Sequence, residues 1–170
     1  MSATSFSLHR IISGGQTGVD RGALDAAIKL DLPHGGWCPR DRRAEDGPIP
    51  QRYQLQETAA LDYKVRTEKN VEDADGTLIL CRGPLKGGTN LTAQLAEVHN
   101  KPLLVIDLME LDDLTKLDGD ALGLGVQHVH RWLADHQIET LNVAGPRESQ
   151  NPGIARDACE FLTEVLAAAR

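Results

Sequence analysis

Two continuous apolar runs, Thr77–Cys81 (TLILC) and Leu103–Asp107 (LLVID), constrain the fold more than any other feature of this sequence. Both runs are short, and neither shows the alternation of polar and apolar residues that marks a half-exposed strand. Continuous apolar strands are typical of a parallel sheet that helices cover on both faces. The two runs therefore predict buried strands in a parallel sheet.

Three further short segments have the composition of strands and complete the expected sheet: His9–Ser13, Pro33–Trp37 and Leu141–Ala144. Helical periodicity is found between the strands, in Val19–Leu30, Tyr63–Asp73, Thr89–Val98, Val126–His136 and Ile154–Val165. Strands that alternate with amphipathic helices are typical of βαβ units. We therefore expect an α/β protein with a doubly wound, mostly parallel, Rossmann-like sheet and helices on both of its faces.

Two stretches lack a clear period. The segment Cys38–Gln51 is rich in Pro, Gly, Arg and Asp, and we expect a loop there. The segment Met109–Gly125 is polar with scattered leucines, and we expect it to be irregular. Helix starts are expected at capping side chains, namely Thr17, Thr89 and the pair Asn151–Pro152.

Length and composition restrict the class of protein. A chain of 170 residues without linker or repeat predicts one ligand-binding domain over residues 1–170. The formal net charge of −7 argues against non-specific binding to nucleic acid or anionic membranes. No apolar run could span a bilayer, and the first residues lack the apolar segment of a signal peptide. The 3 scattered cysteines argue against a disulfide framework and favour a reducing, cytoplasmic location.

A glycine-rich loop follows the first expected strand and leads into the first expected helix. Glycines let a ligand approach the backbone closely, and a helix start offers free N–H groups to an anion. The pattern matches neither the dinucleotide fingerprint nor the Walker A motif. It predicts an anion-binding turn, against the alternative of a tight turn alone. Its candidate residues are Gly14, Gly15, Gln16, Thr17, Gly18, Asp20 and Arg21.

A second glycine loop, Gly83–Thr89, lies between a strand and a helix in the same way. Its candidate ligand-binding residues are Gly87, Gly88 and Thr89. Because the carboxyl ends of parallel strands share one edge of a sheet, the two loops could hold one phosphate or two linked ones. The alternative is a loop with a helix cap, in which Lys86 is only solvated.

Further candidates are Trp37, Arg40 and Arg43 around the first expected loop, Arg66 and Asn70 on the expected helix Tyr63–Asp73, and Arg147 after the last expected strand. Arginine pairs well with phosphate and stacks on rings. Arg66 and Asn70 share one face of a helix because they are four residues apart. The alternative is a set of solvated surface ion pairs, which are common and weak.

Signals for a metal or a nucleophile are poor. The 6 histidines are dispersed, and His128 and His130 have no nearby cysteine and no H-E-x-x-H pattern. No serine nucleophile elbow is present. Cys38 lies beside basic residues that could lower its pKa, although a single cysteine is more often incidental. The sequence marks no catalytic residue and no catalytic metal.

Several blocks of this chain, in order, resemble the molybdenum-cofactor carrier protein family. The blocks are Ile11–Asp25, Gly35–Pro39, Arg43–Pro50, Tyr63–Val71, Gly87–Thr89 and Asn142–Ser149. That family is similar to a wider Rossmann-like group, which includes phosphoribohydrolases, often mislabelled lysine decarboxylases, and the DNA-processing protein A fold. The resemblance implies a carrier of the molybdenum cofactor, a pterin with a terminal phosphate, or of a nucleotide-like ligand. It also implies a homo-oligomer.

Two other functions stay open: a phosphoribohydrolase-like enzyme that cleaves an N-glycosidic bond in a nucleotide, and a nucleotide-sensing module. Phosphoribohydrolases carry a P-G-G-x-G-T-x-x-E motif whose Glu assists cleavage. Aligning Thr89 with the threonine of that motif places Thr92 where the Glu is required. This departure disfavours the enzyme, although a carboxylate such as Asp20 could act from elsewhere. We expect a small phosphorylated ligand, no nucleic-acid partner and no membrane partner.

Overall fold

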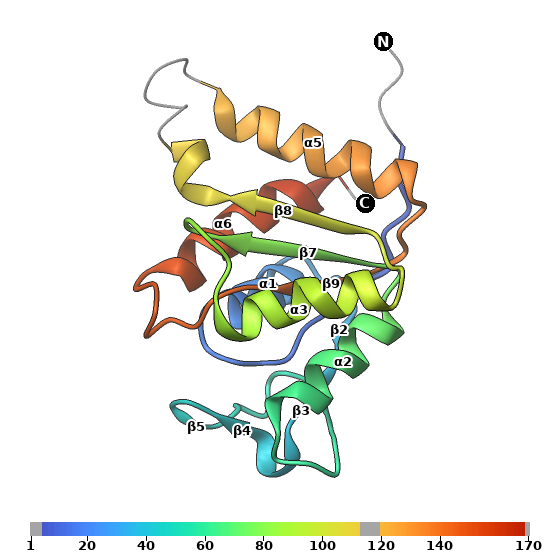
Figure 1. Ribbon diagram of the computed structural model, residues 1–170. Helices are drawn as coiled ribbons and strands as arrows, with labels where there is room; N and C mark the ends of the chain where they lie inside the picture. Colours follow the sequence, from blue (N-terminus) through green and yellow to red (C-terminus); the bar gives the residue numbers. More distant parts are fainter. Residues whose placement is uncertain (1–4, 113–119, 169–170) are drawn as a thin grey trace.

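A five-stranded parallel sheet forms the centre of the computed structural model, which describes residues 5–112 and 120–168 (Figure 1). The strand order is β2-β1-β9-β7-β8, and every neighbouring pair is parallel. The strands are β1 (Arg10–Ile12), β2 (His34–Gly35), β7 (Gly76–Cys81), β8 (Leu103–Asp107) and β9 (Thr140–Ala144). The Rossmann-like α/β fold expected from the sequence is confirmed.

Helices cover both faces of the sheet, which explains why β7 is apolar along its whole length (Figure 1). Leu78 and Leu80 belong to a core with α1, α5 and α6, whereas Ile79 and Cys81 pack in a cluster with side chains near α3. Successive strand residues point to opposite faces, so both faces need apolar side chains. The helices are α1 (Val19–Lys29), α2 (Tyr63–Asp73), α3 (Gly87–Val98), α5 (Ala121–Asp135) and α6 (Ile154–Ala167).

The strand order reverses beside β1. From β1 the chain moves to β2 on one side, and it later places β9 and β7 on the other side. Ligands of such sheets bind beyond the carboxyl ends of the strands at this reversal. Three loops gather there: residues 13–18 after β1, residues 82–86 after β7, and residues 145–153 after β9.

The segment expected as a loop, Cys38–Gln51, contains short ordered elements instead. They are β3 (Trp37–Cys38), η1 (Arg40–Arg42), β4 (Arg43–Ala44) and β5 (Gly47–Pro48), and β6 (Gln56–Glu57) pairs with β3. A small core of its own holds the segment against α1, through Leu24, Cys38, Ala44, Ile49 and Tyr53. Two-residue strands are too short to show a hydrophobic period, so periodicity could not predict them.

The expected helix caps are wrong by one to three residues. Gly18 precedes α1 in place of Thr17, Gly153 precedes α6 in place of Asn151, and Lys86 precedes α3, which places Thr89 inside the first turn. None of these three N-cap positions has a side-chain capping bond. Helices α1, α3 and α6 therefore begin at glycine-rich backbone without a side-chain cap, so capping preferences could not predict where they start.

The segment Met109–Gly125 is also more regular than expected, because residues 108–112 are helical and α5 begins at Ala121. Residues 113–119 of that prediction lie outside the described residues. By contrast, the predicted bounds Tyr63–Asp73 and Leu103–Asp107 match α2 and β8. Among the described residues, no helix is long and apolar enough to cross a membrane.

Candidate functional site

A pocket of about 320 Å³ lies at the carboxyl ends of β1 and β9, between α2 and the start of α3. It brings together seven of the residues selected from the sequence: Gln16, Asp20, Arg66, Gly87, Gly88, Thr89 and Arg147. Its wall is completed by Tyr63, Thr67, Leu91, Thr92, Ala144, Gly145, Pro146 and Gln150. We call this space the arginine pocket.

A buried ion pair forms the floor of the arginine pocket. Arg66 Nη1 lies 3.4 Å from Asp20 Oδ2, and the same oxygen accepts a 3.1 Å hydrogen bond from the backbone N–H of Gln16. The side chains are only 13% and 4% exposed. Burial raises the pKa of Asp20, and the Arg66 charge offsets part of that shift.

Gly14 makes this arrangement possible. A Cβ atom on Gly14 would lie 2.0 Å from Arg66 Nη1 and 2.5 Å from Cζ, so the guanidinium lies directly on the bare backbone. Any larger residue would displace the arginine. The glycine loop after β1 therefore positions a cation, and the cation rather than the loop backbone lines the pocket.

Two buried donors at this site have no hydrogen-bond partner within the described structure, Gln16 Nε2 and Arg66 Nε. The Gln16 amide cannot turn without loss, because its Oε1 accepts from the backbone N–H groups of Thr17 at 3.1 Å and Glu45 at 2.9 Å. An unpartnered buried donor costs about 1–3 kcal/mol. Both donor atoms have almost no accessible surface, so a ligand acceptor would reach them only if the surrounding side chains moved.

Three guanidinium groups converge on the ring of Tyr63. Their Cζ atoms lie 4.9 Å (Arg147), 5.1 Å (Arg43) and 5.8 Å (Arg66) from the ring centroid. The only close carboxylates described for Arg66 and Arg147 are Asp20 at 3.4 Å and Glu45 at 4.0 Å. Like charges held this close repel, so the cluster favours an anion of more than one charge.

The start of α3 forms the opposite wall. A Cβ on Gly87 or Gly88 would meet no atom within 4 Å, so these glycines face open space rather than packed side chains. Thr89 is buried, and Thr92 Oγ1 donates to the Gly88 carbonyl at 2.9 Å. The free N–H groups of a helix start and its dipole favour an anion at this wall.

Four of the remaining candidates in the first loop serve packing. Gly15 has a positive φ and would bring a Cβ within 2.5 Å of Leu55, and a Cβ on Gly18 would lie 2.2 Å from the Pro146 carbonyl oxygen. Thr17 donates to Glu45, and Arg21 pairs with Asp46 at 2.6 Å. These contacts hold the glycine loop against residues 45–55 and against the loop after β9.

The other candidates lie apart from the arginine pocket. Asn70 is buried, accepting from the Trp37 backbone N–H at 2.8 Å and donating to its carbonyl at 3.0 Å. The Trp37 indole N–H donates to Asp73. Arg40 is exposed beside Asp41, whereas Arg43 does not line the pocket itself but contacts the ring of the wall residue Tyr63. Burial raises the pKa of the Cys38 thiol, opposite to the activation that its basic neighbours could have given.

Sequence reasoning missed several wall residues of the pocket, notably Thr67, Gln150 and the Gly145–Pro146 pair. A usable signal existed for some of them. Tyr63 and Thr67 are one helical turn apart and adjoin Arg66, and Gly145–Pro146 directly precede Arg147. Gln150 offered no such signal, because its place depends on the path of the loop after β9.

A separate cluster that the dispersed histidines did not predict lies outside the pocket. Glu68, Glu72 and His99 place ligand atoms within 4.8 Å of one another, with His99 Nε2 at 3.1 Å from Glu68 Oε1. Exposed groups of this kind form ion pairs without a metal.

The parallel sheet, its strand order and the pocket at its reversal define a Rossmann-like α/β protein. The family model of the circularly permutated YpsA SLOG family matches residues 11–166, and the chain belongs to this family. It is also similar to a crystal structure named "Putative molybdenum carrier protein" from Syntrophus aciditrophicus SB. The identity is 46%, the TM-score 0.85, and the match covers 94% of this chain and 96% of that one. No curated protein matches the chain.

Proposed function

We propose that this protein binds and carries a small phosphorylated ligand of the pterin or nucleotide class, with the molybdenum cofactor as the leading candidate. The observation that carries the proposal is the set of three guanidinium groups, from Arg43, Arg66 and Arg147, that converge on the ring of the wall residue Tyr63. A phosphate has acceptor oxygens in the number and geometry that such donors need.

The pocket composition favours binding through an anionic group. Arg66 and Arg147 supply cations, the start of α3 supplies backbone N–H groups, and the open Gly87–Gly88 surface admits a group as wide as phosphate. Asp20 is the only carboxylate in the wall. Its negative charge pairs with the charge of Arg66, so the second wall arginine, Arg147, leaves the pocket with an excess of positive charge.

The name of the similar crystal structure supports molybdenum as the cargo. The wall residues favour holding it through the phosphate of a cofactor rather than by direct metal ligation. Among residues 5–112 and 120–168, no cysteine or histidine lines the arginine pocket. Thiolate and imidazole ligands for a bare metal ion are therefore missing from this wall, whereas the phosphate of a pterin cofactor fits it. A molybdate oxyanion is the competing cargo, because it would use the same arginines.

The enzyme alternative is less well supported. The Thr92 hydroxyl, at the position of the expected glutamate, donates to the Gly88 carbonyl and is a poor acid or base at neutral pH. Asp20 is the one wall carboxylate that could act on a glycosidic bond, and Arg66 and the Gln16 backbone N–H already occupy its Oδ2 oxygen.

Other expectations remain part of this proposal. We infer one ligand-binding domain over residues 1–170, a cytoplasmic location, a homo-oligomer, no nucleic-acid partner and no catalytic metal. The acidic net charge of −7 and the free cysteines Cys38, Cys81 and Cys159 support the nucleic-acid and compartment expectations. The resemblance to the wider Rossmann-like group supports the oligomer.

The experiment is native mass spectrometry of freshly purified protein, followed by titration with phosphate-bearing probes and with molybdate. We expect a retained phosphorylated pterin or nucleotide in the wild-type protein and in the control variant Arg131→Gln, which changes an exposed arginine on α5. Arg66→Gln should lose it, because one charge-assisted hydrogen bond is worth about 1.5–3 kcal/mol, or roughly tenfold or more in affinity. Binding of molybdate but of no phosphorylated probe would replace the cofactor with the oxyanion as cargo.

A further inference from the structure

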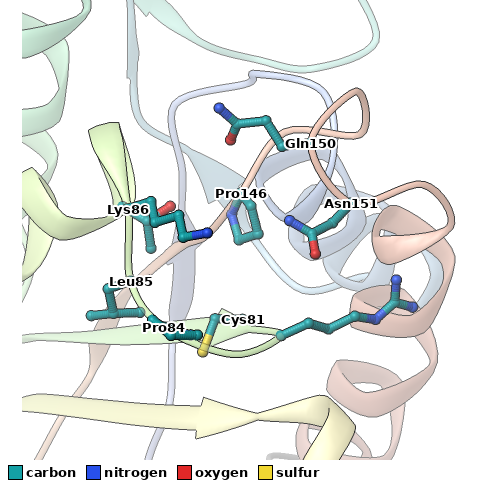
Figure 2. Close-up of a pocket in the computed structure, with 9 residues that line it drawn as sticks. Cys81, Pro84, Leu85, Lys86, Pro146, Gln150 and Asn151 are labelled. Atoms are coloured by element: carbon teal, nitrogen blue, oxygen red, sulfur yellow. The ribbon is translucent and has the colours of Figure 1, made fainter.

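A second cavity of about 370 Å³ adjoins the arginine pocket on the other side of the α3 start. The two spaces share three wall residues, Thr89, Pro146 and Gln150, and therefore meet at the first turn of α3. The remaining wall consists of Cys81, Arg82, Pro84, Leu85, Lys86 and Asn151. Figure 2 shows this cavity, with Lys86 and Asn151 on opposite sides of Pro146.

The charge of the second cavity differs from that of the arginine pocket. The Arg82 guanidinium is engaged, because it donates to Asp157 and, at 3.2 Å, to the Pro152 carbonyl. Lys86 is the one remaining cation of this wall, and it is exposed to solvent. An anionic group would therefore prefer the arginine pocket, where Arg66 and Arg147 converge.

Apolar side chains make up part of the wall of the second cavity instead. Pro84, Leu85 and Pro146 contribute hydrocarbon, and Leu85 packs on the cluster that contains Cys81. Burial first, and then the charge of Asp107, raise the pKa of the Cys81 thiol to about 11, so the thiol stays neutral. Surfaces of this kind suit the face of an aromatic ring.

An amide completes the wall. The backbone groups of Asn151 are already hydrogen-bonded, because its N–H donates to the Arg147 carbonyl and its carbonyl accepts from the Ile154 N–H. Its side-chain amide has no hydrogen-bond partner among residues 5–112 and 120–168. An amide offers one donor group and one acceptor, which matches the mixed edge of a ring that carries nitrogen and carbonyl groups.

We propose that the second cavity holds the ring of a ligand whose phosphate lies in the arginine pocket. The ligand crosses the first turn of α3, its planar nitrogen heterocycle packs on Leu85, and the ring edge pairs with the Asn151 amide. This inference rests on the proposed function, and it adds an orientation and a chemical class: the ligand must have a ring and an anion at opposite ends. The guanidinium groups of Arg66 and Arg147, which both line the arginine pocket, support the anionic end independently of the helix start.

The test compares three probes by calorimetry: inorganic phosphate, ribose 5-phosphate and guanosine monophosphate, which carries a ring with a mixed donor and acceptor edge. The wild-type protein should bind guanosine monophosphate roughly tenfold or more tightly than ribose 5-phosphate, because only the former reaches the second cavity. Equal affinities for these two probes would overturn the inference. Failure of all three probes to bind would instead reject the proposed function.

Two variants test whether the second cavity is the source of the tighter binding of guanosine monophosphate. Leu85→Trp fills it, and Asn151→Leu keeps the approximate size of the side chain while removing the amide. Each should abolish most of the advantage of guanosine monophosphate and leave affinity for inorganic phosphate within about twofold. Val98→Trp, at an exposed position of α3, is the matched control for Leu85→Trp. If the advantage persists in Asn151→Leu and in folded Leu85→Trp, the ring lies elsewhere.

Discussion

Arg66 Nη1 lies 3.4 Å from Asp20 Oδ2 beneath the bare backbone of Gly14, and this buried pair sets the charge of the arginine pocket. The carboxylate fixes one edge of the guanidinium and leaves Nε without a partner. Asp20 therefore orients the cation but also weakens its attraction for an incoming anion. The balance between these two effects leads to the first prediction.

Replacing Asp20 with asparagine should tighten anion binding. The substitution keeps the size of the side chain and removes the one negative charge of the wall, so sulfate affinity should rise roughly three- to tenfold. Isothermal titration measures this change, and Asp135→Asn on α5 serves as the control because that carboxylate is exposed. Weaker sulfate binding in Asp20→Asn would mean that orienting Arg66 matters more than the charge.

The same pair predicts a pH dependence. Burial raises the pKa of Asp20 above its ordinary value of 3.8, so the folded protein holds this proton at pH values where the unfolded chain has released it. The contribution of Asp20 to stability therefore falls as the pH rises from 3.8 through the raised pKa. Sulfate affinity should increase as the pH falls through this window, and Asp20→Asn should remove that increase. Sulfate titrations at several pH values measure how affinity depends on pH in the wild-type protein and in Asp20→Asn.

Gly88→Ala should separate ligand binding from folding. A Cβ at this position meets nothing within 4 Å, and alanine in a helix is favoured over glycine by up to about 1 kcal/mol. Thermal unfolding should therefore show equal or higher stability. The added methyl group projects toward the open wall of the pocket, so affinity for inorganic phosphate should fall at least about threefold. Unchanged affinity would place the anion away from the α3 start.

Gly15→Val, by contrast, should lower both stability and ligand affinity. Gly15 has φ +76, and a Cβ there would lie 2.5 Å from Leu55 and 3.0 Å from Ile49. Overpacking typically costs about 1–3 kcal/mol, and the backbone conformation adds strain. Denaturant unfolding should record the loss of stability, and phosphate affinity should fall more than tenfold because the loop that supports Arg66 shifts. A stable variant with normal affinity would remove the first glycine loop from the site.

The part of the site that the sequence could predict is the part that rests on local pattern. Glycines after β1 and before α3, and Arg147 after β9, were selected because strand ends of a parallel sheet share an edge, whereas helical spacing selected Arg66. Gly15 and Gly88 looked equivalent in sequence, yet one meets Leu55 and the other meets open space. Residues 37–57 form a cover over the first loop, and their long-range packing on Leu24 has no local signature.

Trp37 and Asn70 lie outside the wall of the arginine pocket for a related reason. Helical spacing placed Arg66 and Asn70 on one face of α2, and it could not tell that Asn70 pairs with the Trp37 backbone while Arg66 reaches Asp20. The difference depends on where β3 crosses α2. Periodicity therefore identifies a face, and tertiary packing decides which residue on that face meets the pocket.

Salt should discriminate a small anionic ligand from nucleic acid. The guanidinium cluster is local in a chain with net charge −7, so affinity for guanosine monophosphate should fall as salt rises while long duplex DNA binds negligibly. Fluorescence anisotropy with labelled DNA and competition by guanosine monophosphate measure both. Tight, non-specific duplex binding at physiological salt would favour a DNA-processing role.

The last prediction concerns catalysis and rests on Thr92. Cleavage of an N-glycosidic bond needs a group that stabilises positive charge on the ribose and activates water, which a carboxylate can do. The Thr92 hydroxyl is neutral and already donates to the Gly88 carbonyl at 2.9 Å. General acid–base assistance is worth roughly a hundredfold to ten-thousandfold, so its loss permits phosphate binding without useful turnover.

We therefore expect no significant release of free base from AMP or GMP, measured by liquid chromatography after long incubation. Thr92→Glu should gain little activity, because a new carboxylate at this buried wall position would lack the rest of a catalytic site. The decisive control is Asp20→Asn. Steady base release by the wild-type protein that disappears in Asp20→Asn would make Asp20 a catalytic residue and would replace the carrier with an enzyme.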